Sequence, residues 1–175
     1  MNPITTCDLP ETALLVRYRH AGAYTDCFVL DIPRAVSQAA YVEAFYTTWL
    51  FKLERRLLSW FMHRPSTDLE AAELALGRRD EFAAWRVEGR DNDQLLMCDF
   101  QERTRSWLMS VTARDGHGSR LYFGSAVVPV VDSSGQARMG LLFRALLGFH
   151  RFYSRALLHA AVSRLSNIGD ELSST

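Results

Sequence analysis

The spacing of apolar and polar residues predicts four short antiparallel strands in the middle of the chain. Residues 104–113 and 119–131 alternate apolar and polar side chains, and the tight turn Asp115-Gly116-His117-Gly118 joins them. Residues 83–88 and 94–100 are two further strand candidates with a polar turn between them. Because only short polar turns separate these segments, we expect them to form an antiparallel meander.

From about residue 138 to residue 165 the apolar residues follow helical spacing, with no proline to interrupt them. One face of this predicted helix carries Leu142, Leu146, Phe149, Tyr153, Ala156 and Ala160, and the opposite face carries Arg144, Arg151 and Arg155. We favour a core-packing helix with a solvated arginine face; a basic amphipathic surface for anionic lipid or an acidic partner is the alternative. A long terminal helix after a run of strands needs a sheet to lie on, which indicates a container for a small apolar molecule.

The first half of the chain is predicted to hold one strand and two or three helices. The aromatic and β-branched run of residues 24–32 predicts a strand that ends before Pro33. Ser37 is a candidate N-cap for the following helix, and Thr48 is a candidate N-cap for a second one. The segment Thr67-Asp68-Leu69-Glu70 matches a capping box, which predicts the start of a further short helix.

The order of the predicted elements is a strand, two or three helices, four strands and a helix. Strands that are grouped together, rather than alternating with helices, favour an α+β fold. A length of 175 residues suffices for one core, and we predict a single domain over residues 1–175. Residues 1–14 lack periodicity and are expected to form a loose N-terminal arm, and residues 167–175 are expected to form a disordered tail.

Composition and charge narrow the classes of partner. The 20 basic and 20 acidic residues cancel, so the overall charge does not favour a nucleic-acid partner. The first residues lack the pattern of a secretory signal, and no apolar run is long enough to cross a membrane. Cys7, Cys27 and Cys98 show no CxxC spacing, so we expect reduced thiols in a cytoplasmic protein.

The chain lacks the common motifs of catalysis and cofactor binding. It has no glycine-rich phosphate loop, because Gly116-His117-Gly118 lies in a predicted hairpin turn, and it has no Gly-x-Ser-x-Gly nucleophile elbow. The 5 histidines show no metal-ligand spacing. We therefore assign no catalytic residue, no metal and no cofactor from the sequence.

Strand alternation places a set of candidate ligand-binding residues on one face of the meander. We expect that face to look toward the terminal helix and to enclose an apolar cavity with a few polar groups. The candidate ligand-binding residues are Arg105, Trp107, Met109, Tyr122, Gly124, Phe149, His150, Tyr153 and Asp26.

Arg105 has two interpretations. At the mouth of a cavity its fork of donors would hold a carboxylate or a phosphate. The interpretation that we favour is a cross-strand pair with Glu88, Asp99 or Glu102.

Three features together resemble an uncharacterised bacterial family of the START-like, or SRPBCC, superfamily of helix-grip proteins. They are Tyr24-Thr25-Asp26-Cys27-Phe28 at the first strand, the polar-apolar meander, and Phe149-His150-Arg151 within the terminal helix; the resemblance covers roughly residues 23–162. It implies an antiparallel sheet wrapped around the C-terminal helix, with a deep hydrophobic cavity between them. The superfamily includes lipid carriers, polyketide cyclases and aromatases, and hormone-binding proteins, so the fold does not settle the function.

Three functional hypotheses follow. The leading one is a binding protein for a small hydrophobic or amphipathic ligand, held between the sheet and the C-terminal helix. The second is an enzyme of cyclase, dehydratase or hydrolase type that uses the same cavity, with His150, Tyr153 or Asp26 as acid–base groups. The third is a non-enzymatic interaction module, such as a homodimer, that uses the aromatic residues around Trp49 and Trp60.

Overall fold

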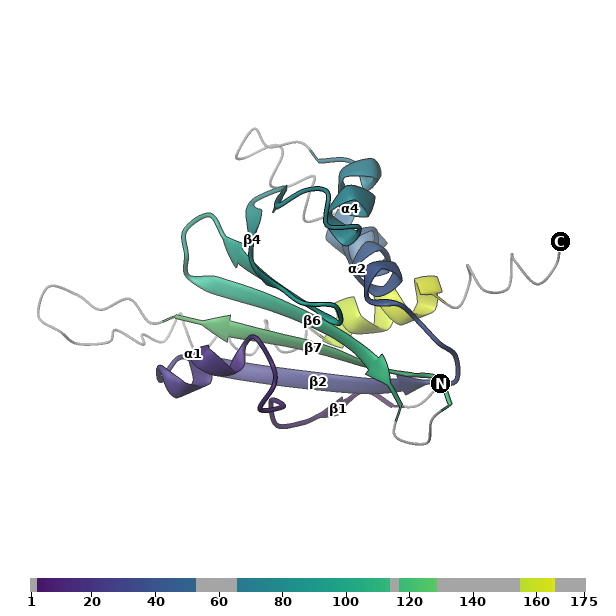
Figure 1. The fold of residues 1–175 in the computed structure, drawn as a ribbon, viewed down its shortest axis with the longest axis horizontal. Coiled ribbons are helices and arrows are strands. Elements are labelled where there is room, and N and C mark those ends of the chain that lie inside the picture. The colour runs from purple at the N-terminus through teal and green to yellow at the C-terminus, as the bar shows by residue number, and fades with distance from the viewer. Residues whose placement is uncertain (1–2, 53–65, 114–116, 129–154, 166–175) are drawn as a thin grey trace, which may run out of the picture.

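The computed structural model describes residues 3–52, 66–113, 117–128 and 155–165 (Figure 1). The labelled elements are β1 (Thr5–Thr6), α1 (Val16–His20), β2 (Tyr24–Ile32), α2 (Gln38–Tyr46), α4 (Asp68–Ala75), β3 (Glu81–Phe82), β4 (Trp85–Arg90), β5 (Gln94–Asp99), β6 (Thr104–Thr112) and β7 (Ser119–Val127). Residues 49–52 and 155–165 are helical as well. The predicted α+β fold is confirmed, whereas most of the predicted terminal helix and the predicted tail lie outside the described residues.

All of the described strands join one seven-stranded antiparallel sheet in the order β1-β2-β7-β6-β5-β4-β3. The strands β4 to β7 form the predicted meander, each pairing with the next along the chain. The predicted strand of residues 24–32 is confirmed as β2, and it pairs with β7 over its whole length, from Tyr24 opposite Val127 to Ile32 opposite Ser119. This long-range pairing attaches the first long strand to the last.

Side-chain caps fix where the helices begin, as the sequence predicted. Ser37 Oγ accepts a hydrogen bond from the backbone N–H of Ala40, 3.2 Å away, at the start of α2. Thr48 Oγ1 does the same for the N–H of Phe51, also at 3.2 Å, where residues 49–52 turn helical. The capping box of Thr67 and Glu70 is present at the start of α4. Each cap satisfies donors that the first turn of a helix leaves unpaired.

One face of the sheet is covered by helices. The helices α2, α4 and residues 155–165 pack against it (Figure 1). The strands contribute Phe28, Leu30, Ile32, Phe82, Leu95, Met97, Leu108, Leu121 and Phe123 to this core, and the C-terminal helical segment contributes Leu157, Leu158, Ala161, Val162 and Leu165. Described side chains from the sheet and from residues 157–165 therefore form one continuous buried core.

The opposite face of the sheet is covered by the N-terminal segment. β1 pairs with β2, and Leu9, Ala13 and Leu15 are buried at 6%, 2% and 0% exposure. They pack against Cys27, Leu96, Trp107, Met109 and Ala126 from the strands. Residues 5–15 thus differ from the expected loose arm. Their few apolar positions have no helical or strand period, because each one fits a separate site on the sheet.

The central strands are consequently buried on both faces. In β5, successive residues Leu95, Leu96, Met97 and Cys98 are all at most 1% exposed. Their side chains alternate between the helical cover and the N-terminal cover. Two separate apolar cores result, with the sheet between them.

Gly124 in β7 allows the N-terminal cover to approach the sheet closely. A Cβ atom at this position would lie 2.9 Å from Trp107 Cε3 and 3.0 Å from Leu15 Cδ2, and also 3.0 Å from the carbonyl oxygen of Asp26. The space that the sequence left open for a helix or a ligand is therefore taken by the side chains of Trp107 and Leu15.

We predict that Gly124→Ala lowers the free energy of unfolding by about 1 to 3 kcal/mol, because one methyl group overpacks a filled core. Gly89→Ala is the matched control, since its Cβ would meet Leu14 Cδ1 at 3.4 Å, an ordinary contact. Urea unfolding followed by circular dichroism measures both. If the two variants are equally stable, the N-terminal segment can move to accommodate the added methyl group at Gly124, and the prediction is contradicted.

Candidate functional site

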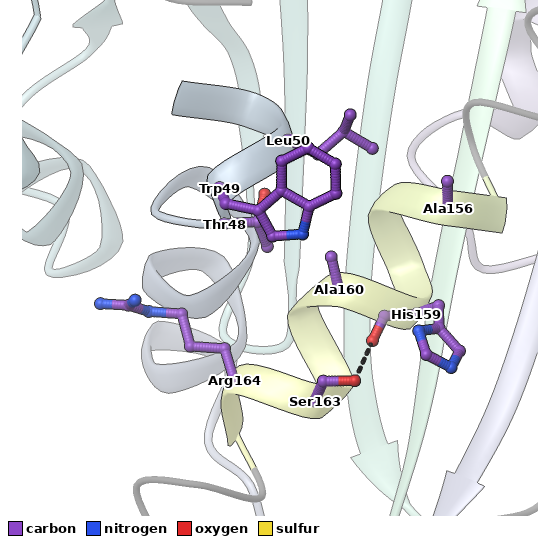
Figure 2. A pocket seen from close by; sticks show the side chains of 8 residues that line it. All are labelled: Thr48, Trp49, Leu50, Ala156, His159, Ala160, Ser163 and Arg164. Carbon is purple, nitrogen blue, oxygen red and sulfur yellow. Dashed lines mark hydrogen bonds between the residues drawn. The ribbon is translucent and has the colours of Figure 1, made fainter. Parts of the chain in front are cut away.

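A pocket of about 780 Å³ lies on the flank of the C-terminal helical segment, where this segment faces the start of the helical residues 49–52 (Figure 2). It is lined by Thr48, Trp49, Leu50, Ala156, His159, Ala160, Ser163 and Arg164. The pocket therefore joins two helical segments that are far apart in the sequence. It lies beside the C-terminal segment, away from the side that packs on the sheet.

The cap at Thr48 sets the position of the aromatic wall. Thr48 is 1% exposed; its hydroxyl donates to the carbonyl of Phe45 at 3.0 Å and accepts from the N–H of Phe51. This turn holds Trp49 at the surface with 71% exposure, and Figure 2 shows its indole extending toward Ala160. The small side chains of Ala156 and Ala160 form the apolar wall on the other side.

The polar lining is basic. Ser163 donates its hydroxyl hydrogen to the carbonyl of His159 at 3.0 Å, so this hydroxyl is used within the helix. Figure 2 shows the side chains of His159 and Arg164 extending to opposite sides of the helical segment. Among the described residues no carboxylate lines the pocket, and no ion pair involves Arg164. The pocket therefore combines an apolar body with an arginine that is open to an anion.

The predicted strand residues are brought together, but on the other face of the sheet. Trp107 lies opposite Gly124 and Met109 lies opposite Tyr122 in the β6–β7 register, and Arg105 shares this face. The N-terminal segment covers them, with Trp107 0% and Met109 4% exposed. This placement corrects the expectation that they look toward the terminal helix. Both faces of β6 carry apolar residues, so alternation alone does not tell which face the helix covers.

The polar groups on this covered face are satisfied by the N-terminal segment. Gln94 is central: its Oε1 accepts from the indole N–H of Trp107 at 2.8 Å and from the backbone N–H of Leu14 at 2.9 Å. Its Nε2 donates to the carbonyl of Thr12 at 3.1 Å. These bonds close the face around Trp107, and they explain why a half-polar segment packs firmly on an apolar surface.

Arg105 forms the ion pair that the favoured interpretation expected. A β-bulge shifts the register of β4 between Val87 and Gly89, and Glu88 at this bulge meets Arg105. The Nε of Arg105 donates to Glu88 Oε2 at 2.8 Å and to the Tyr18 hydroxyl oxygen at 2.8 Å. The hydroxyl of Tyr18 also donates to Glu88, and Arg17 Nη2 donates to Glu88 at 2.6 Å. These groups, which we call the α1 latch, attach α1 to the sheet.

The electrostatics of the α1 latch favour the charged form of Glu88. Burial raises the pKa of Glu88, but the hydrogen bond from Tyr18 and the charges of Arg105 and Arg17 outweigh it, so the pKa lies below its usual value. Burial and the hydrogen bond to Glu88 raise the pKa of Tyr18. A neutral phenol thus donates to a carboxylate beside a guanidinium, an arrangement that holds a helix in place.

Asp26 lies on the helix-covered face, apart from the α1 latch. Its Oδ1 accepts hydrogen bonds from the hydroxyl of Ser125 and from the backbone N–H of Ser125, the latter at 3.1 Å. Its Oδ2 is buried and has no hydrogen-bond partner among the described residues. Ser106 lies beside Ser125 in the register and is 8% exposed, so one row of the apolar face is polar. The predicted residues Phe149, His150 and Tyr153 lie outside the described residues, and an acid–base role for His150, Tyr153 or Asp26 stays a prediction.

Sequence reasoning gave none of the eight pocket residues a ligand-binding role, and it did not group them. Ala156 and Ala160 lie in the predicted apolar stripe, and Trp49 is one of the aromatic residues of the predicted interaction module. Arg164 carried no signal beyond its charge. Only a prediction that residues 48–50 contact the C-terminal helical segment would have grouped these residues into one pocket.

No protein-family model matches this chain, and no curated protein matches it. Among solved structures, the chain is similar to the solution NMR structure of the C-terminal domain of protein DR_A0006 from Deinococcus radiodurans. The two share 12% identity over 76% of this chain and 93% of that chain, with a TM-score of 0.29. A likeness at this level carries no argument about function.

No described helix has the length and apolar character that a membrane span needs. Within the same part of the chain, no group of three or more histidine, cysteine, aspartate or glutamate residues is placed to hold a metal ion.

We predict that Glu88→Gln lowers the free energy of unfolding by about 2 kcal/mol near neutral pH, because it removes charge-assisted bonds from three donors. The folded-state pKa of Glu88 is lowered, so its contribution is complete above the unfolded-state pKa and is lost as the pH falls through the folded-state pKa. The stability difference between the two proteins should therefore shrink from about pH 7 to about pH 3.

Urea unfolding at a series of pH values measures this difference. Glu11→Gln is the control, because Glu11 pairs with Arg19 at 2.6 Å while 77% of its side chain is exposed. Water and salt screen such a pair, and we expect little change. A Glu88→Gln protein with wild-type stability at every pH would contradict the role given to the α1 latch.

Proposed function

We propose that the protein binds a small amphipathic molecule, with an apolar body and an anionic head, in the pocket between residues 48–50 and the C-terminal helical segment. The observation that carries this proposal is the combination of apolar walls with an unpaired arginine and no lining carboxylate among the described residues. Ligand pockets have volumes of roughly 300 to 1,000 Å³, and this pocket, at about 780 Å³, lies in that range.

Each lining residue has a role in the proposal. The exposed indole of Trp49 covers the apolar body of the ligand, and Ala156 and Ala160 leave width for it. The guanidinium of Arg164 pairs with a carboxylate or phosphate through its fork of donors. The site proposed here lies on the flank of the helical segment, because the described side chains of that segment that face the sheet are buried in a common core with it.

We also propose that the chain is a START-like, helix-grip protein of the cytoplasm. The order of elements and the packing of residues 155–165 on one face of an antiparallel sheet support this assignment. The superfamily includes lipid carriers and hormone-binding proteins, which agrees with the leading hypothesis of a small hydrophobic or amphipathic ligand.

Isothermal titration with decanoate and with uncharged decanol tests the proposal. We expect both to bind, Trp49→Ala to weaken both, and Arg164→Gln to weaken decanoate alone by about tenfold, the loss of one charge-assisted pair. Leu69→Ala is the matched control, because Leu69 is an exposed apolar residue, at 70%, that does not line the pocket.

Native mass spectrometry of the protein purified from cells adds a test that does not depend on the probe. A bound mass that Trp49→Ala loses and Leu69→Ala retains would support the pocket. Binding that is indifferent to Trp49 and Arg164 would place the ligand elsewhere and contradict the proposal.

The exposure of Trp49 favours one second candidate, a homo-oligomer that buries this indole. Light scattering at increasing protein concentration separates the two. A dimer that Trp49→Ala dissociates would support the interaction module. A monomer whose tryptophan fluorescence changes with ligand, and no longer does so in Trp49→Ala, would support the binding protein.

A further inference from the structure

Cys7 and Cys27 face each other where the N-terminal segment meets β2. The register pairs Thr5 with Val29 and Thr6 with Phe28, so Cys7 and Cys27 are the next pair. The backbone N–H of Cys7 donates to the carbonyl of Cys27 at 3.1 Å, and the two Sγ atoms also lie 3.1 Å apart. Both cysteines are free thiols in this structure.

The two thiols differ in exposure and acidity. Cys27 is buried, with 4% exposure, whereas Cys7 is half-buried. The hydrogen bond with Cys27 lowers the pKa of Cys7 despite its burial and the nearby charge of Asp8. The same hydrogen bond, together with burial, raises the pKa of Cys27. Cys7 is therefore the more accessible of the two thiols and the more acidic one.

We propose that Cys7 and Cys27 are a reversible thiol-oxidation site that reacts with small-molecule disulfides of the glutathione type. The Cys7 thiolate attacks one sulfur of the disulfide RSSR, forming a Cys7–SR bond and releasing RS⁻. Cys27 then gives up its proton and attacks the Cys7 sulfur, which forms the Cys7–Cys27 bond and releases the second RS⁻. The two protein thiols lose two electrons, and RSSR gains them to become two thiols.

The geometry needs only a small adjustment. The sulfur atoms must approach from 3.1 Å to the bonding distance of about 2.05 Å, which side-chain rotation supplies while the strand pairing holds the backbones together. The disulfide would lock the N-terminal cover onto β2 beside the core of Trp107. By closing a loop between residues 7 and 27, it should raise the melting temperature by about 5 to 10 °C.

Oxidised glutathione, applied to the full-length protein in a series of redox buffers, tests the proposal. Free thiols counted with a thiol reagent after denaturation should fall from three to one, and peptide mapping should find Cys7 joined to Cys27. Cys27→Ser should stop at a mixed disulfide with one glutathione on Cys7, and Cys7→Ser should gain no glutathione. Cys98→Ser is the matched control and should oxidise as the wild type does, because Cys98 is 0% exposed and lies in β5.

Peptide mapping of the wild-type protein stands independently of the variants, should a variant fold poorly. Three free thiols that persist in buffers able to oxidise exposed dithiols would overturn the proposal. So would glutathione found on Cys98, or a Cys27→Ser protein that leaves Cys7 unmodified. None of these readouts depends on ligand binding at Trp49, so failure here leaves the pocket proposal untouched.

Discussion

The strands β2, β7, β6 and β5 carry apolar side chains on both faces, and each face has to be removed from water by a different part of the chain. Helices cover one face, and the N-terminal segment covers the other. The hydrophobic effect scales with apolar area and is indifferent to which segment supplies the cover. Which segment covers which face is therefore decided by close fit and by polar bonds. On the N-terminal side these are the close approach at Gly124, the hydrogen bonds of Gln94, and the α1 latch of Tyr18, Glu88 and Arg105.

Burial on both faces of the sheet also limits where side chains are accessible to a ligand or a reagent. On the N-terminal side, polar groups are paired and side chains fill the space, so the residues around Trp107 stabilise the fold. The exception is the Cys7–Cys27 pair, where a half-buried thiol meets a buried one at the seam between the cover and the sheet. On the helical side, the residues that reach the sheet form a filled core, and the open space lies at the flank of the C-terminal helical segment. The proposed binding site is thus formed by two helical segments, and no strand residue lines it among the described residues.

Local signals predicted the longer strands and the starts of the helices, but not β1, α1 or β3. The bounds of β2, the four strands of the meander, the caps at Ser37 and Thr48 and the capping box at Thr67 follow from interactions between residues a few positions apart. The bulge at Glu88 and the short strands β1 and β3 gave no such signal, because a bulge is an irregularity of pairing and a two-residue strand has no period. The sequence predicted an ion pair for Arg105 with one of three acidic residues. The bulge in β4, which the sequence did not predict, places Glu88 as the partner.

The sequence by itself determined an α+β chain with a meander beside a helical cover, since alternation, turns and caps act over short distances. It did not single out the pocket residues as ligand-binding residues. Only the tertiary structure decided that Trp107, Met109 and Gly124 meet the N-terminal segment while Leu108 and Phe123 meet the helices. A strand with apolar residues on both sides indicates that both of its faces are buried. It does not indicate which segment of the chain packs on each face. That assignment comes from long-range fit, in which Leu15 occupies the gap above Gly124 and Trp49 meets Ala160 across the pocket.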